Sequence, residues 1–225
     1  MSGGHLPDGA RSRLFGVYPA LVTDLQDPQQ QGRVQVKLPW LGSDGEKVTA
    51  WATLVTPYAD DDQGFEMLPE IDSMVVVAFE AGDLERPYIL GAAWNGTTTL
   101  PAPPDNTNNL RVIKTRAGSR LEFDDTTGAP TVAITVAGDK SGAVHKIVMD
   151  DAGDSITIKA RNGAEVSITA GGGITVRANT SVSVNAPTVD VTAAMSTFSG
   201  VVKCDTLIAT TVVGATYTPG VGNIW

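Results

Sequence analysis

Five short segments in the C-terminal half of the chain share one pattern: ITIKA at residues 156–160, VSITA at 166–170, ITVRA at 174–178, VSVNA at 182–186 and VDVTA at 189–193. In each segment Val or Ile alternates with a polar residue, and an alanine closes the unit. The closing alanines lie 10, 8, 8 and 7 positions apart. Because successive side chains of a β-strand point to opposite faces, the pattern predicts a half-buried strand of about five residues followed by a tight connection.

The length of this repeat indicates how many chains build the core. A single chain that winds into a closed β-helix needs roughly 18 or more residues per turn, whereas an eight-residue unit supplies about one strand and one corner. Three chains wound together give about 24 residues per layer, enough to enclose a triangular core. The repeat therefore predicts an intertwined homotrimer, with an ordinary β-sandwich or a single-chain solenoid as the alternative. The expected trimer core consists of the alternating apolar residues Ile156, Ile158, Val166, Ile168, Ile174, Val176, Val182, Val184, Val189 and Val191.

The N-terminal half has a different texture, with short apolar runs separated by turn residues. The runs cover residues 14–25, 32–38, 49–57, 74–79 and 86–94. The second run alternates cleanly, which indicates one buried face, while the fourth is too apolar to alternate and is expected to be buried on both faces. Five short strands with turn signals between them predict a small barrel of the OB type.

The whole chain is therefore expected to be all-β, with a five-stranded OB-type barrel followed by an intertwined three-chain β-helix needle. A proline-rich, asparagine-rich stretch without an apolar period separates the two parts. The expected divisions are a flexible N-terminal arm at 1–12, the OB-fold domain at 13–96, a linker at 97–110, the trimeric β-helix at 111–204 and a C-terminal apex at 205–225.

Composition narrows the classes of partner. The 225 residues carry a formal net charge of −9, which opposes binding to nucleic-acid backbones and to anionic membrane surfaces. Cys204 is the single cysteine of the sequence, so no intrachain disulfide forms. No basic patch and apolar run of a secretory signal opens the sequence, and no apolar stretch approaches the ~20 residues that span a bilayer. We expect a protein made in the cytoplasm without a signal peptide.

The polar residues do not form a recognisable catalytic, cofactor or metal motif. His5 and His145 belong to no His-x-His pair or Cys/His cluster, so a metal site is not expected. Carboxylates gather at 60–62, and at 124–125 with 150–151, where solvated turns are the favoured reading over calcium binding or acid catalysis. No Ser/His/Asp set or Gly-x-Ser-x-Gly sequence indicates a hydrolase. We therefore expect no catalytic residues and no cofactor.

A set of short pieces, none specific alone, runs in a fixed order through the barrel and into the needle. The pieces are Asp27-Pro28, Gly32-Arg33-Val34-Gln35-Val36, Leu38-Pro39, Trp51-Ala52, Gly64, Leu68-Pro69-Glu70-Ile71, the run at 75–79, Gly82-Asp83, Arg86-Pro87, Leu90-Gly91 and TRAGSRLEFDD at 115–125. Followed by the repeat, this ordered set resembles phage baseplate assembly protein V and the VgrG proteins of type VI secretion. The resemblance covers roughly residues 14–200. Three positions depart from the pattern: Asp72 and Met74 stand where Gly and Glu are usual, and Ser119 where His is common.

The resemblance implies a trimeric, non-enzymatic central spike at the baseplate of a contractile tail or injection system, driven through the target cell envelope by sheath contraction. Since no hub domain precedes the barrel, a separate hub protein at the end of the tail tube is expected. The apolar C-terminus, three copies of which would form a blunt apex, either caps the needle or, as the resemblance implies, binds a small PAAR-like tip protein. The residues expected at that apex are Tyr217, Pro219, Ile224 and Trp225.

Three other functions compete with a spike. A receptor-binding tail fibre or tailspike shares a trimeric β-helix, but it usually needs an aromatic-rich surface that the repeat lacks. A polysaccharide-degrading tail enzyme needs a pair of carboxylates in a groove. An OB-type nucleic-acid binder is opposed by the acidic charge.

Overall fold

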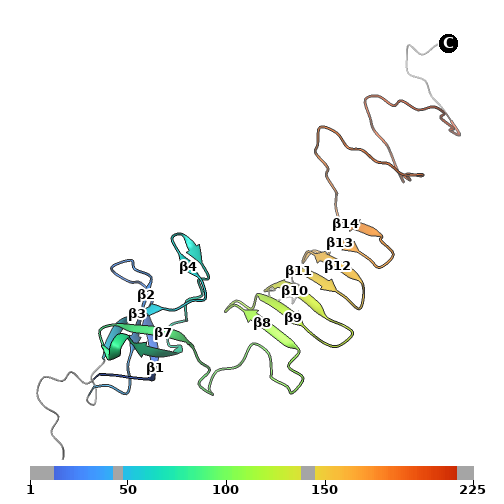
Figure 1. Ribbon diagram of the computed structural model, residues 1–225. Helices are drawn as coiled ribbons and strands as arrows, with labels where there is room; N and C mark the ends of the chain where they lie inside the picture. Colours follow the sequence, from blue (N-terminus) through green and yellow to red (C-terminus); the bar gives the residue numbers. More distant parts are fainter. Residues whose placement is uncertain (1–12, 43–47, 138–144, 217–225) are drawn as a thin grey trace, which may run out of the picture. The chain divides into compact units, whose positions relative to one another are not determined.

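The computed structural model describes residues 13–42, 48–137 and 145–216, and within these ranges the chain is all-β, as predicted (Figure 1). The helical structure in these ranges is a single 3-10 turn, η1 (Glu80–Gly82). No helix in the described ranges has the length and apolar character needed to cross a bilayer.

Five strands of the N-terminal half close into a barrel in the order β1-β2-β3-β7-β6. Four of the five pairings are antiparallel, and β3 pairs with β7 in parallel. The predicted five-stranded barrel is confirmed. A short hairpin, β4–β5, lies between β3 and β6 in the sequence and is not part of the barrel. The strands are β1 (Val17–Asp24), β2 (Arg33–Lys37), β3 (Thr49–Leu54), β4 (Ala59–Asp60), β5 (Gln63–Gly64), β6 (Met74–Phe79) and β7 (Pro87–Ala92).

The core of the barrel follows the alternation of its strands. Val34, Val36 and Leu38 are fully buried, as the alternation at 32–38 predicted. Along β6, Val75, Val77 and Phe79 are buried, whereas the residues between them are only half-buried. The expectation that this run is buried on both faces is therefore wrong. A closed barrel has one interior, so the second face of an apolar strand still meets solvent or loops.

An ion pair holds the loop between β1 and β2. The carboxylate of Asp27 accepts two hydrogen bonds from the Arg33 guanidinium, at 3.0 and 2.9 Å, and two from the backbone N–H groups of Gln29 and Gln31, at 3.0 and 2.9 Å. The Asp27 side chain is only 3% exposed. The Arg33 side chain, followed by the backbone donors, holds the pKa of Asp27 far below its ordinary value of 3.8. Gly32 has a φ of +69°, which glycine adopts without strain.

Two departures from the family pattern keep the local structure intact. Asp72 adopts a φ of +66°, so the left-handed turn expected of a glycine forms with an aspartate, and its backbone N–H donates to the Val22 carbonyl at 2.9 Å. The hydroxyl of Ser119 accepts a hydrogen bond from the Ala137 N–H at 3.0 Å, which ties the turn before β9 to the end of β10.

Seven further strands form one antiparallel sheet in which each strand pairs with the next along the chain. The last three are the first three segments of the repeat, so these predicted strands are confirmed. The strands are β8 (Leu110–Lys114), β9 (Arg120–Asp124), β10 (Thr131–Val136), β11 (His145–Asp150), β12 (Ser155–Lys159), β13 (Glu165–Ile168) and β14 (Ile174–Arg177).

Beyond Asn179 the chain forms a second unit, and its described part, residues 180–216, contains no strand or helix. The strands predicted at 182–186 and 189–193 are absent from the single chain, and no backbone–backbone hydrogen bond joins residues within 180–216. A strand forms only where a neighbour completes its ladder, and one chain offers this segment no neighbour. The intertwined needle expected over 111–204 is not formed by one chain and stays a prediction.

The Asp27–Arg33 pair gives a testable prediction. Because the pKa of Asp27 is lower in the folded chain than in the unfolded chain, its ionised carboxylate stabilises the fold above pH 3.8. This contribution to the free energy of unfolding is lost as the pH falls from 3.8 toward the lowered pKa. Asp27→Asn should therefore lower the Tm of the barrel at pH 7, and the gap to the parent chain should narrow steadily below pH 3.8. Thermal melts followed by tryptophan fluorescence would measure this, since Trp40 and Trp51 lie in the barrel. Glu66→Gln, at an exposed carboxylate, is the control, and equal curves for both variants would contradict the role of the pair.

Candidate self-association surface

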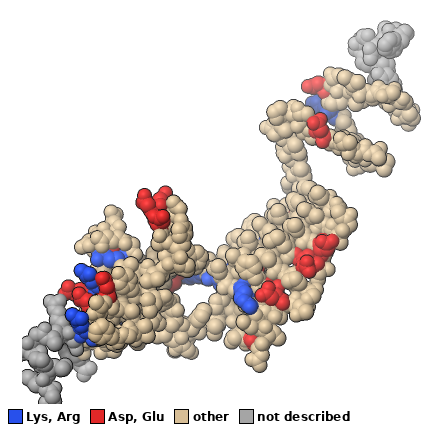
Figure 2. Space-filling view, in the orientation of Figure 1, with Lys and Arg blue, Asp and Glu red and all other residues tan. Residues whose placement is uncertain are grey.

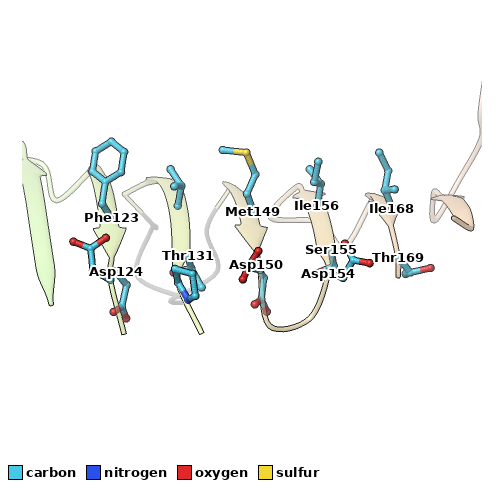
Figure 3. Close-up of a pocket in the computed structure, with 14 residues that line it drawn as sticks. Phe123, Asp124, Thr131, Met149, Asp150, Asp154, Ser155, Ile156, Ile168 and Thr169 are labelled. Atoms are coloured by element: carbon cyan, nitrogen blue, oxygen red, sulfur yellow. The ribbon is translucent and has the colours of Figure 1, made fainter. Parts of the chain in front are cut away.

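One face of the seven-stranded sheet is apolar over most of its extent, and Arg111 and His145 are its two polar members. The strand register aligns Ile113 with Leu121, Phe123 with Val132, Ile134 with Ile147 and Met149 with Ile156. It then aligns the repeat residues Ile156 with Ile168, Ile158 with Val166, Val166 with Val176 and Ile168 with Ile174. The two residues of an aligned pair lie on the same face of the sheet, so all of these residues share one face. Figure 3 shows Phe123, Met149, Ile156 and Ile168, from four different strands, pointing to one side.

This apolar face is open in the single chain. Most of its large residues are between 38% and 69% exposed, with Val176 in β14 at 58%, whereas Leu121 and Val132 are half-buried. Burying a Val or Ile side chain is worth roughly 1.5–3 kcal/mol, so a face of this extent strongly favours a covering partner.

The opposite face is mostly polar and carries ion pairs, although Val112, Ala133 and Val148 also lie on it. Arg120 pairs with Glu122 along β9, and Lys159 lies 3.8 Å from Glu165 across β12 and β13. Thr157 and Ser167 face each other between these strands. The division of the sheet into one apolar and one charged face indicates which side binds a partner and which side meets water.

The chain continues the same pattern after the sheet ends. We call residues 180–216 the extended segment. Four valines in it, at positions 182, 184, 189 and 191, are between 60% and 73% exposed. Of the ten predicted core residues, the first six therefore lie together on the apolar face of the sheet, and these four lie in a segment that its own chain does not pair. A role for all ten in a trimer core stays a prediction.

The larger part of this face was not predicted from the sequence. Leu121, Phe123, Ile134, Ile147 and Met149 extend it over β9, β10 and β11. Their signal was available in the alternation of residues 120–124 and 131–136, but these strands do not repeat at a fixed interval. A period-two test of each short run, without a requirement for repetition, would have found them.

The carboxylates of the sheet corners stabilise turns, in line with the reading of solvated turns. Asp124 accepts hydrogen bonds from the backbone and hydroxyl of Thr126 at 2.9 and 2.6 Å, and Asp150 accepts one from the Gly153 N–H at 3.0 Å. Figure 3 shows Asp124 and Asp150 at the ends of their strands. Among the described residues, no three His, Cys, Asp or Glu side chains are grouped to hold a metal ion.

Two tryptophans of the barrel are engaged in packing. Trp40 stacks on Tyr18 with ring centroids 4.5 Å apart, and its indole N–H donates to the Pro19 carbonyl at 2.8 Å. The Arg33 guanidinium lies 6.0 Å from the ring of Trp51. These two rings support the barrel and its β1–β2 loop. The expected apex residues Tyr217, Pro219, Ile224 and Trp225 lie outside the described residues, as does His5.

Comparison with known families supports the resemblance seen in the sequence. Residues 18–94 match the family described as the type VI secretion system/phage-baseplate injector OB domain. This range starts in β1 and ends shortly after β7, so it coincides with the closed barrel. The predicted resemblance to baseplate and VgrG proteins is confirmed.

Similar curated proteins are much longer than this chain. The type VI secretion system spike protein VgrG3 of Vibrio cholerae is 31% identical over 110 residues, which are 46% of this chain and 11% of the relative. The spike protein VgrG2a of Pseudomonas aeruginosa is 34% identical over 111 residues, 46% of this chain and 13% of the relative. The actin cross-linking toxin VgrG1 of Vibrio cholerae is 27% identical over 123 residues, 52% of this chain and 11% of the relative. The chain thus spans 11% to 13% of the length of these three relatives.

Two adjacent residues of β14 test whether the apolar face is a self-association surface. Val176 lies on the apolar face and Thr175 on the opposite face, and both are exposed in the single chain. Val176→Asp would bury an unpaired charge in the association, at a cost on the order of several kcal/mol per copy. Thr175→Asp keeps its charge in water and should change stability by no more than about 0.5 kcal/mol.

Light scattering on both variants reads out the difference. The parent chain and Thr175→Asp should have a mass that is a multiple of 23.4 kDa, and Val176→Asp should shift toward the single-chain mass. If both substitutions leave the same mass and Tm, this face is not the surface that associates.

Proposed function

We propose that this chain, whose barrel matches the injector OB domain of phage baseplates and type VI secretion systems, is the central spike of a contractile tail or injection machine. In this proposal three copies assemble into one needle with the barrels at its base. Sheath contraction drives the needle through the envelope of a target cell. The role is mechanical, and the chain carries out no catalysis.

The observation that carries the proposal is the apolar face of β8–β14, together with the alternating Val residues that follow it in the sequence beyond Asn179. Three copies turned inward would cover these faces with one another, and the eight-residue repeat beyond Asn179 matches three interwound chains better than one. Two copies could cover the sheet faces, but two short strands per layer do not enclose a core. The number three rests on the repeat, and the drive to associate rests on the exposed Val and Ile side chains.

A spike also has to transmit force without unfolding. The sheet is suited to this load because every strand is joined to its neighbours by a ladder of backbone hydrogen bonds. The connecting turns that the structure describes are also short. The Gly118 N–H, for example, donates to the Thr115 carbonyl at 2.9 Å, and the Gly163 N–H donates to the Ala160 carbonyl at the same distance. Such closed turns leave little slack for a strand to detach.

The partners in this proposal follow the path of the needle. The trimer of barrels sits on a separate hub protein at the end of the tail tube, a PAAR-like protein covers the tip, and the target is a cell envelope. Nucleic acid is not a partner. The chain is made in the cytoplasm and works in the baseplate of the particle. The similar proteins VgrG3 and VgrG2a are named as spike proteins, which supports the proposed spike function.

The proposed trimer predicts how fragments behave. A fragment covering residues 111–225 should trimerise without the barrel, because the apolar face and the repeat both lie within it. The barrel fragment 13–96 should be monomeric or weakly associated, since its apolar residues are already buried in its own core. Light scattering should give three times 23.4 kDa for the full chain. A monomeric or dimeric full chain would refute the proposed assembly.

The proposed tip predicts a separable binding function. Deleting residues 217–225 should abolish binding to a PAAR-like protein encoded beside this chain, because the apolar residues expected at the apex are removed. The mass of the deletion variant should remain that of the trimer, since the core residues are untouched. Calorimetric titration with the purified tip protein measures the loss. Binding of the deletion variant with unchanged affinity would place the contact elsewhere.

A further inference from the structure

The segment between β3 and β6 builds a projecting arm, which we define as Val55–Asp72 (Figure 1). Both ends of the arm are tied to the barrel. The Val55 N–H donates to the Ile89 carbonyl in β7, and the Asp72 N–H donates to the Val22 carbonyl in β1, each at 2.9 Å. The hairpin β4–β5 forms its outer part. The arm is therefore anchored by the barrel at both ends.

Internal hydrogen bonds fix the shape of the arm. The Phe65 N–H donates to the Tyr58 carbonyl at 2.9 Å, and the Thr56 hydroxyl donates to the Phe65 carbonyl at 2.6 Å. The Tyr58 hydroxyl donates to the Gln63 side-chain oxygen at 2.6 Å. These bonds cross from one side of the hairpin to the other, so a partner would meet a preformed surface.

The arm exposes several large apolar side chains to solvent. Six of its large apolar residues are between 43% and 52% exposed: Val55, Tyr58, Phe65, Met67, Leu68 and Ile71. A groove between the arm and the β1–β2 loop is lined by Leu25, Leu54, Phe65 and Leu68, with Asp60 and Glu66 also at its border. The Asp27–Arg33 pair closes one side of this groove and is already satisfied internally. The groove thus offers apolar contacts beside carboxylates.

The charge of the arm is concentrated and of one sign. Residues 55–72 contain the carboxylates of Asp60, Asp61, Asp62, Glu66, Glu70 and Asp72 and no Lys or Arg. The arm therefore has a formal charge of −6 and the rest of the chain −3, and one of the six carboxylates, Glu70, is paired with Arg116 at 2.9 Å. Figure 2 shows acidic residues gathered at the outer end of the hairpin.

We propose that the arm is a docking surface for a different protein, one that presents an apolar side chain flanked by Lys or Arg. Within the proposed function, on which this inference rests, that protein is the hub on which the barrels sit. The apolar side chain enters the groove beside Phe65 and Leu68, and the basic residues pair with the aspartates of the hairpin tip. The apolar contact supplies affinity, and the charges speed encounter and exclude acidic surfaces.

A second copy of the chain is a poorer occupant of this groove. An arm that contacted a second copy would meet either another acidic arm or a remaining surface that is also net negative. Like charges placed close together repel, so arm-to-arm contact is disfavoured. The apolar face of β8–β14 is the surface that suits other copies, and the arm suits a basic partner.

The test measures binding of the full-length chain to the purified hub protein encoded beside it, by calorimetric titration. Asp60→Asn with Asp61→Asn removes two charges while keeping the side-chain shape, and it should weaken binding by roughly tenfold or more at low salt. The matched control is Asp190→Asn with Asp205→Asn, which removes two exposed charges from the extended segment and should leave the affinity unchanged. Phe65→Ser should weaken binding at all salt concentrations, whereas Val17→Ser, at an exposed apolar residue of β1, should not.

The outcomes distinguish the docking role of the arm from the proposed spike function. Loss of hub binding in the arm variants, with trimer mass and fluorescence melts retained, supports the docking arm. Equal binding by the arm variants and their controls overturns the arm as the docking surface and leaves the spike itself standing. A trimeric parent chain that does not bind the hub overturns both the arm and the proposed seat of the barrels. Binding to a second copy through the arm, seen as a change of mass in the arm variants, also overturns the inference.

Discussion

The two-residue period of the β-strand is the constraint on which the C-terminal half depends. Alternation sends Ile156, Ile158 and their apolar counterparts on six other strands to one side of the sheet, and most of the threonines, serines and charged residues to the other. A slip of one residue in any pairing would mix the two faces. The fixed register therefore does more than join strands, because it collects residues from β8 to β14 into one continuous apolar surface that a single chain leaves uncovered.

The two halves of the chain solve the same problem in different ways. In the barrel, β1 pairs with β6, so the sheet closes and its apolar face becomes the core of one molecule. In the second half the strands follow one another without closing, and β14 ends the ladder at Arg177. An open sheet with one apolar face needs a second layer. The proposed trimer supplies that layer from identical copies.

How far the sequence predicted this structure depends on where the pairing information lies. The buried face of residues 32–38 and the strands at 156–160, 166–170 and 174–178 were predictable, because alternation and turn residues are local signals. The run in β6 was misread, since an apolar run alone does not tell a barrel strand from one buried on both faces. The arm was missed because its exposed apolar residues follow no period. Strands at 182–186 and 189–193 need partners that their own chain does not contain.

The extended segment beyond Asn179 has a consequence for the order in which the molecule matures. Each strand from β8 to β14 pairs with its neighbour in the sequence, and such local pairing lets a single chain form the sheet quickly. Residues 180–216 have no such neighbour, so under the proposed assembly their ordering waits for other chains and depends on concentration. Maturation then runs in one direction, from barrel to tip. Until assembly is complete, each new chain exposes the Val and Ile side chains of residues 180–216. Chaperones or rapid co-assembly would have to protect these side chains from aggregation.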